Sequence, residues 1–212
     1  LFFVPKPGTH LGASYRSRID HEIKGNANFS VPDAALILTR GGQFMDTSAH
    51  TKVTLPDQVM LGFSQNIGTR WTLSGDAMWT NWSLVRELRT DFASSQADSA
   101  QSLQWNDAWR LALGLSYMPE QAKWTIRTGF AFDQTPIPNA DFRPARIPDN
   151  NRYWLTAGFS YRILTNVTLH GAYAHLFIPN PAINSNSSTG DRLNGQYTAQ
   201  VNIVGLQLDW RF

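Results

Sequence analysis

Hydrophobic and polar residues alternate along most of this chain. From Trp71 to Trp79 the odd positions are Trp, Leu, Gly, Ala and Trp, whereas the even positions between them are Thr, Ser, Asp and Met. Successive side chains of a β-strand point to opposite faces, so this pattern predicts a strand with one apolar and one polar face. Eight segments follow the pattern, namely residues 9–24, 51–66, 70–84, 103–118, 123–133, 151–163, 166–177 and 195–212.

The two ends of the chain refine this interpretation. Residues 1–5 are typical of the tail of a preceding strand, with Pro7 and Gly8 in the turn after it. In the last segment the apolar parity switches upstream of Leu206. One inserted residue flips the two faces of a strand, so we expect a β-bulge near Val204 or Gly205.

The connections between the segments alternate in length. Short connections fall at about 66–70, 119–123 and 164–166, and long ones at about 25–50, 85–102, 134–150 and 178–194. Strands joined by short turns indicate antiparallel hairpins. Tight turns at one end and long loops at the other are typical of an outer-membrane β-barrel. Within the long loops, the apolar run 34–38 predicts a short helix or strand, and residues 184–190 predict a flexible polar loop.

Aromatic residues mark both ends of four of the segments. They are spaced eight residues apart on the apolar face, as Trp71 and Trp79, Trp109 and Tyr117, Trp124 and Phe132, and Tyr153 and Tyr161. Eight residues span about 26 Å, or about 20 Å along the axis of a barrel whose strands tilt by about 40°. That is close to the apolar band of roughly 25 Å that aromatic girdles flank. We therefore predict that these residues, together with Trp210 and Phe212, form membrane girdles.

Composition agrees with a barrel that faces both lipid and water. Of the 212 residues, 12% are aromatic and only 16% are charged, against about a quarter in ordinary soluble domains. The net charge of +2 does not indicate a nucleic-acid partner, and the absence of Cys excludes disulfides, thiolate metal sites and cysteine nucleophiles. The sequence contains no run of 18 apolar residues, so it predicts no transmembrane helix.

Eight motifs, spread over nearly the whole chain, resemble those of one protein family and occur in the same order. They are LGASYRS, TLPDQVMLGFS, DAMWTNWS, DAWRLALGLSY, WTIRTGFAFDQTPIP, IPDNNRYWLTAGFSYR, GAYAHLF and GLQLDWRF. These stretches resemble the C-terminal half of the FadL/OmpP1/TodX outer-membrane transporters of Gram-negative bacteria. The resemblance implies an all-β fold, a transmembrane antiparallel β-barrel with about eight strands in this chain and about fourteen in the whole protein. It also implies transport of long-chain fatty acids or aromatic hydrocarbons, without a cofactor.

The resemblance further implies that residues 1–212 are the C-terminal part of the barrel. The N-terminal hatch and first strands of the family would then lie outside the chain. The partners it implies are outer-membrane lipid and lipopolysaccharide, a hydrophobic small molecule, and the barrel-assembly machinery through the C-terminal strand. It implies a monomer and no nucleic acid.

Transport of hydrophobic compounds needs an apolar pocket, a cation for any carboxylate, and a route out. The candidate cations are lumen-facing arginines, because a guanidinium matches a carboxylate in geometry. Our ligand-binding candidates in the lumen are Arg110, Arg127, Arg16 and Arg18, with the first two favoured because they lie on neighbouring strands. The alternative is that inward arginines pair with aspartates such as Asp76 or Asp133. Phe142 and Ile147 could form an apolar lip in the loop 133–151, or that loop could serve packing alone.

Two other functions stay open from the sequence. One is a passive or structural outer-membrane pore. The other is an outer-membrane phospholipase-type enzyme, for which His175, on the apolar face, would be the candidate base. No GxSxG or P-loop motif occurs, and the histidines show no metal-ligand spacing. We therefore expect no catalytic residue and no metal ligand.

Overall fold

The computed structural model describes residues 1–186 and 190–212. It contains fifteen strands and two short 3-10 helices. Their bounds are β1 (Phe2–Lys6), β2 (Thr9–Arg16), β3 (Ile19–Ala27), η1 (Asp33–Thr39), β4 (Thr47–Leu55), β5 (Gln58–Ile67), β6 (Trp71–Thr80), η2 (Trp82–Leu84), β7 (Glu87–Phe92), β8 (Ser99–Ser102), β9 (Ala108–Tyr117), β10 (Trp124–Asp133), β11 (Arg152–Leu164), β12 (Val167–Ile178), β13 (Ala182–Asn186), β14 (Arg192–Gln196) and β15 (Ala199–Trp210). No helix among the described residues is long and apolar enough to span a membrane.

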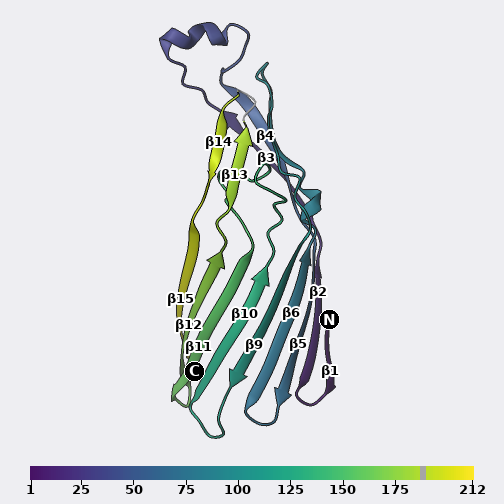
Figure 1. Ribbon diagram of the computed structural model, residues 1–212, viewed down its shortest axis with the longest axis vertical. Helices are drawn as coiled ribbons and strands as arrows, with labels where there is room; N and C mark the ends of the chain where they lie inside the picture. Colours follow the sequence, from purple (N-terminus) through teal and green to yellow (C-terminus); the bar gives the residue numbers. More distant parts are fainter. Residues whose placement is uncertain (187–189) are drawn as a thin grey trace.

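Nine of the strands form one antiparallel sheet, which confirms the all-β prediction. Its order is β1-β2-β5-β6-β9-β10-β11-β12-β15, so these nine strands lie side by side in the order in which they occur along the chain. The sheet is curved and open, and the two ends of the chain lie at its two opposite edges, on β1 and β15 (Figure 1). The predicted tail at residues 1–5 is strand β1, and the turn after it uses Gly8 at a φ of 80°.

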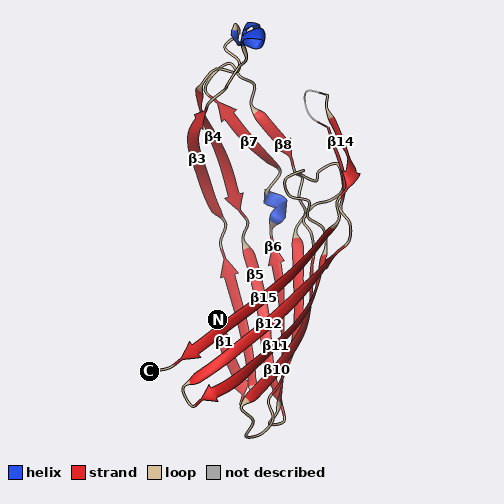
Figure 2. Ribbon diagram, turned by 90° about the vertical axis from the view of Figure 1, so that its left-hand side faces the viewer, coloured by secondary structure: helices blue, strands red, loops and turns tan. Residues whose placement is uncertain are grey.

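Three predicted strands were too long, because each is broken into two. Segment 9–24 divides between Arg16 and Ile19, segment 51–66 between Leu55 and Gln58, and segment 195–212 between Gln196 and Ala199. The second break holds Pro56, which has no N–H to donate to a strand ladder. Beyond the first two breaks, β3 and β4 join β7 and β8 in a separate four-stranded sheet that extends past the end of the main one (Figure 2).

The long connections therefore carry more regular structure than the sequence indicated. The apolar run 34–38 lies in η1, so the helical alternative was right. Strands β13 and β14 form a hairpin, so the prediction of a flexible loop over 184–190 was wrong for Asn184–Asn186, while 187–189 lie outside the described residues. The short turns lie at the opposite end of the sheet from these extensions, as predicted (Figure 1).

The predicted bulge in the last strand is absent. The pairing of β15 with β12 runs without a shift from Val167 opposite Trp210 to Ile178 opposite Ala199. Asn202 consequently lies on the same face as Leu206, where an apolar residue was expected. Its Oδ1 accepts a hydrogen bond from the Tyr173 hydroxyl at 2.6 Å and contacts His175 Nδ1 at 2.7 Å. These partners satisfy the amide oxygen of Asn202 on the outward face, and the strand continues without an inserted residue.

The main sheet has one face of large apolar side chains. Leu61, Leu113 and Leu155 are 57%, 56% and 53% exposed on it. The predicted girdle residues pair across strands on this face, Trp71 with Tyr117, Trp79 with Trp109, Trp124 with Tyr161, and Phe132 with Tyr153. They make two rows, one near each end of the strands. The eight-residue spacing thus places these aromatics in two rows on one face, and their role as membrane girdles stays a prediction.

Candidate ligand-binding groove

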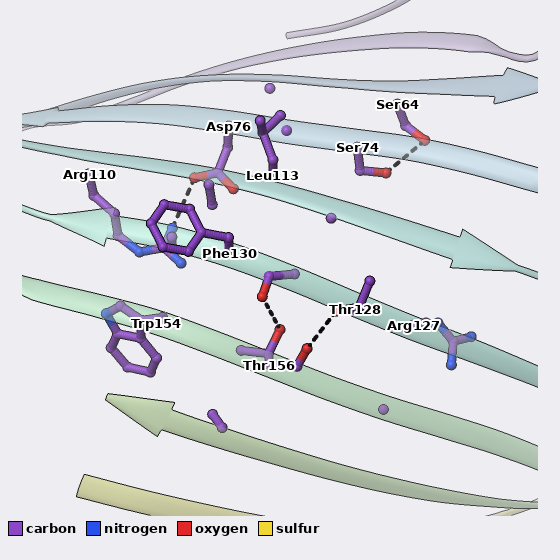
Figure 3. Close-up of a pocket in the computed structure, with 18 of the residues that line it drawn as sticks. Ser64, Ser74, Asp76, Arg110, Leu113, Arg127, Thr128, Phe130, Trp154 and Thr156 are labelled. Atoms are coloured by element: carbon purple, nitrogen blue, oxygen red, sulfur yellow. Dashed lines mark hydrogen bonds and ion pairs between the residues drawn. The ribbon is translucent and has the colours of Figure 1, made fainter. Parts of the chain in front are cut away.

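A groove of about 740 Å³ lies at the middle of the main sheet. Inward residues such as Asp76, Arg110 and Arg127 line it, and it is also bordered by the outward residues Leu113 and Phe130. Its walls come from strands between β1 and β15, and the close-up in Figure 3 shows ten of its lining residues labelled. The inward positions at its centre are small. They are Gly62, Ala112, Gly114, Gly129, Gly158 and Ala172. Small side chains leave the centre of this face hollow, while larger apolar residues such as Met60, Trp154 and Ile203 line it around them.

The wall is tight where β9, β10 and β11 meet. Gly129 lies opposite Gly114 on one side and Thr156 on the other. A Cβ at Gly129 would lie 2.8 Å from Thr156 Oγ1 and 3.2 Å from the Leu113 carbonyl, so no larger residue fits there without movement. Thr156 Oγ1 donates to the Gly129 carbonyl at 3.2 Å, and Thr128 Oγ1 donates to the Thr156 carbonyl at 3.1 Å (Figure 3).

Arg110 is the first predicted site residue that the groove contains. Its side chain comes from β9, and one guanidinium nitrogen lies 2.9 Å from Asp76 Oδ1 on β6 (Figure 3). Arg152 likewise pairs with Asp133 at 3.0 Å and with Asp149 at 2.7 Å. The alternative that inward arginines pair with aspartates is confirmed for these two. A ligand carboxylate at Arg110 would compete with Asp76.

Arg127 lies in the same groove in a different electrostatic setting. It projects from β10, and its guanidinium donates to Ser160 Oγ at 2.6 Å. In the described part of the chain no carboxylate lies within ion-pair distance of it. Its positive charge is therefore available to an anion in the groove.

A smaller hollow of about 410 Å³, the upper hollow, lies at the end of the sheet near the long loops. Trp82 and Trp105 meet there edge to face, with their ring centroids 5.2 Å apart. Ile147, one of the two predicted lip residues, lines this hollow and is 52% exposed. Phe142, the other, is half-buried and does not line it. The loop thus brings one of its two predicted apolar residues to the wall of this upper hollow, and neither of them to the groove.

The loop 134–151 is held in place by buried polar contacts. Thr135 Oγ1 donates to Asp149 Oδ2 at 2.7 Å, and Arg143 Nε donates to the Asp149 carbonyl at 3.0 Å. Arg143 also donates to the carbonyl of Ala182 in β13, so it joins this loop to the last hairpin. Burial lowers the pKa of the Arg143 guanidinium, and nearby Asp149 partly offsets that effect. The loop is therefore a fixed wall of the upper hollow.

The remaining predicted cations lie away from the groove. Arg16 ends β2, and Arg18 lies in the break before β3, both exposed. Neither lines the groove or the upper hollow, and neither forms an ion pair with another described residue. The sequence argument also missed Trp154, which lines the groove between Thr156 and Arg152 on β11. Its inward parity on β11 was visible, but we weighed only charged residues on that face.

The described residues offer no metal site, and His175 lacks the partners that hydrolysis needs. No set of three or more His, Asp or Glu side chains among them could hold a metal ion. His175 does lie on the outward face, as predicted, but its described contacts are with Asn202 and with the ring of Phe177, 4.2 Å away. Those partners supply neither a serine nor an acid, so the phospholipase alternative has no support at this residue.

An apolar outer face, paired rows of aromatics and a hollow inner face define part of the wall of an outer-membrane β-barrel. Residues 2–212 match the model of the outer membrane protein transport proteins (OMPP1/FadL/TodX). The chain belongs to this family, whose members are transport proteins and not enzymes.

Individual relatives agree with the family match. The chain is 32% identical over 156 residues to the long-chain fatty acid transport protein of Escherichia coli O6:H1, which covers 71% of this chain and 34% of that protein. The crystal structure of a Pseudomonas aeruginosa FadL homologue matches with a TM-score of 0.87 and 25% identity, over 99% of this chain and 50% of the other. The Pseudomonas putida toluene transporter TodX shares the fold, with a TM-score of 0.60 and 16% identity over 99% of this chain and 47% of the other. The chain thus spans half or less of the length of these relatives.

Proposed function

We propose that this chain supplies the ligand-binding wall of an outer-membrane transporter for hydrophobic compounds. The observation that carries the proposal is the belt of Gly and Ala residues across the inward face, which leaves an apolar groove where a barrel wall could have been filled by side chains. The fatty acid and toluene transporters among its relatives support this class of cargo. In this proposal the cargo binds in the groove and leaves by diffusion.

The lining of the groove suits weak, mobile binding of an apolar chain. Its polar groups are concentrated at Asp76 with Arg110, at Arg127, and at hydroxyls such as Ser64 and Ser74, which bond to each other at 3.2 Å (Figure 3). Hydroxyls that already form hydrogen bonds within the protein do not need water in the groove as a partner. Dispersion contacts with the apolar lining residues then hold the cargo without fixing its position.

A comparison of two kinds of solute tests this function against the passive-pore alternative. Full-length protein containing these residues is reconstituted into liposomes, and arabinose permeation is measured by liposome swelling alongside the transfer of toluene and oleate. We expect transfer of the hydrophobic compounds and swelling at the rate of protein-free liposomes. Rapid swelling in arabinose with no gain in hydrophobic transfer would contradict the proposal and favour the pore.

A further inference from the structure

A line of hydrogen bonds crosses four neighbouring strands on the inward face. Arg127 on β10 donates to Ser160 Oγ on β11 at 2.6 Å. Ser160 Oγ lies 2.7 Å from His170 Nδ1 on β12, and His170 Nε2 lies 3.0 Å from Asp209 Oδ2 on β15. Gln207 completes the line by donating to Asp209 Oδ1 at 2.6 Å. The line leads from the groove to the edge strand of the sheet.

The guanidinium fixes the start of this line. It can only donate, so Ser160 Oγ accepts from Arg127. The same hydroxyl contacts Nδ1 of His170, whose Nε2 contacts Asp209. Each group therefore orients the next, and the buried Ser160 hydroxyl, in a residue that is 7% exposed, holds the guanidinium in place.

The charge around this line is positive. Arg162 occupies the next inward position of β11 after Ser160, and Arg211 follows Asp209 by two residues. Among the described residues neither of these arginines forms an ion pair. Asp209 is already engaged by His170 and Gln207, so it does not neutralise Arg127. The end of the groove at Arg127 thus attracts an anion.

We propose that Arg127 is a carboxylate-binding subsite of the groove, and that Ser160, His170 and Asp209 are positioning residues for its guanidinium. The inference rests on the proposed function and names its cargo as an apolar chain that carries a carboxylate. Arg127 lies directly opposite Gly158 on β11, and Gly158 lies opposite Ala172 on β12. The belt of small residues therefore lies directly beside the guanidinium.

The geometry gives the bound chain a direction. The headgroup lies at Arg127, and the tail passes the small inward residues Gly129 and Ala131 of β10 toward the loop end, where Asp133 lies about 20 Å from Arg127 along the strand. Arg110 is less suited to the headgroup, because a carboxylate there would have to displace Asp76. The two arginines of the groove therefore differ in role: one closes an internal ion pair and the other receives the ligand.

A matched pair of ligands tests this subsite. Binding of oleate and of oleyl alcohol to full-length protein in detergent is measured for the wild type and for Arg127→Gln. We expect the Kd for oleate to rise about tenfold or more, as for loss of a charged hydrogen-bond donor, and the Kd for oleyl alcohol to change less than about twofold. Arg70→Gln is the control, since Arg70 carries the same charge but pairs with Glu120 at 3.6 Å in a turn outside the groove.

The positioning residues are tested in the same assay. Ser160→Ala removes the acceptor of Arg127 and should weaken oleate binding several-fold without affecting oleyl alcohol. Ser160→Thr keeps a hydroxyl and should restore oleate binding. A role in wall stability alone would change both ligands together in the alanine variant.

Each outcome decides the matter. Equal losses for both ligands in Arg127→Gln would overturn the subsite and show that Arg127 shapes the wall or pairs with another part of the protein. If Arg127→Gln does not fold, Arg127→Lys takes its place, and an unchanged preference for oleate over oleyl alcohol in that variant overturns the role of the guanidinium fork. If wild-type protein binds neither ligand, the proposed function itself fails; if it binds both equally, only the subsite fails.

Discussion

Replacing Leu113 with arginine in the full-length protein is expected to lower its free energy of unfolding by about 2–4 kcal/mol. Leu113 lies at the middle of β9, between the aromatic rows at Trp109 and Tyr117, and is 56% exposed on the outward face. An arginine there would lie at the midplane of the hydrocarbon, where neither water nor a headgroup reaches it. Urea unfolding in lipid vesicles, followed by tryptophan fluorescence, measures the change.

The control for this substitution changes only the depth. Leu164 ends β11 beside a short turn and is 59% exposed, so Leu164→Arg should cost no more than about 1 kcal/mol. Equal stability of Leu113→Arg and the wild type would mean that this face does not contact hydrocarbon.

The second large effect is expected from filling the groove. Ala172 faces inward on β12 and is exposed there, so phenylalanine can be accommodated without displacing the backbone. The added ring would occupy the small-residue belt. Because forcing a chain past such a ring costs about 1–3 kcal/mol, Ala172→Phe should reduce uptake of a hydrophobic substrate about tenfold. Uptake of labelled oleate by cells that express the full-length protein provides the measurement.

The same substitution on the other face is the matched control. Ala77 lies on β6 opposite Leu111, points outward and does not line the groove. Ala77→Phe should leave uptake unchanged. Equal uptake by both variants and the wild type would show that cargo does not pass along the groove, whereas equal loss in both would point to damaged assembly.

Alternation along the sequence was sufficient to predict the main sheet. All eight predicted segments contribute to it, and the aromatic pairs occupy one face as expected. Alternation reports only which face a side chain takes. It therefore could not show that residues 9–24, 51–66 and 195–212 cross from one sheet into another, although Pro56 marked one of the three breaks. The bulge was wrongly predicted for a related reason: Asn202 looked misplaced until Tyr173 and His175, on the neighbouring strand, were seen to satisfy it.

The candidate site was predictable only where neighbouring strands pair simply. The ion pair of Arg110 with Asp76 joins adjacent strands and was among the alternatives considered. The line from Arg127 to Asp209 needs four strands in a known register, and no local pattern supplies that register. The groove itself was overlooked because small residues carry no chemistry of their own, even though Gly and Ala recur at inward positions of several segments.

Accessibility along β9 tests the central claim most directly. These 212 residues contain no cysteine and so add no background label. With any cysteine elsewhere in the full-length protein replaced, single cysteines at Leu111, Ala112, Leu113 and Gly114 can each carry a spin label in protein reconstituted into lipid. The relaxing agents are oxygen, which concentrates in hydrocarbon, and a water-soluble nickel chelate. We expect labels at 111 and 113 to respond to oxygen and labels at 112 and 114 to respond to the nickel chelate. Labels at 111 and 113 that respond to neither agent would place this face against another layer of protein and contradict the account.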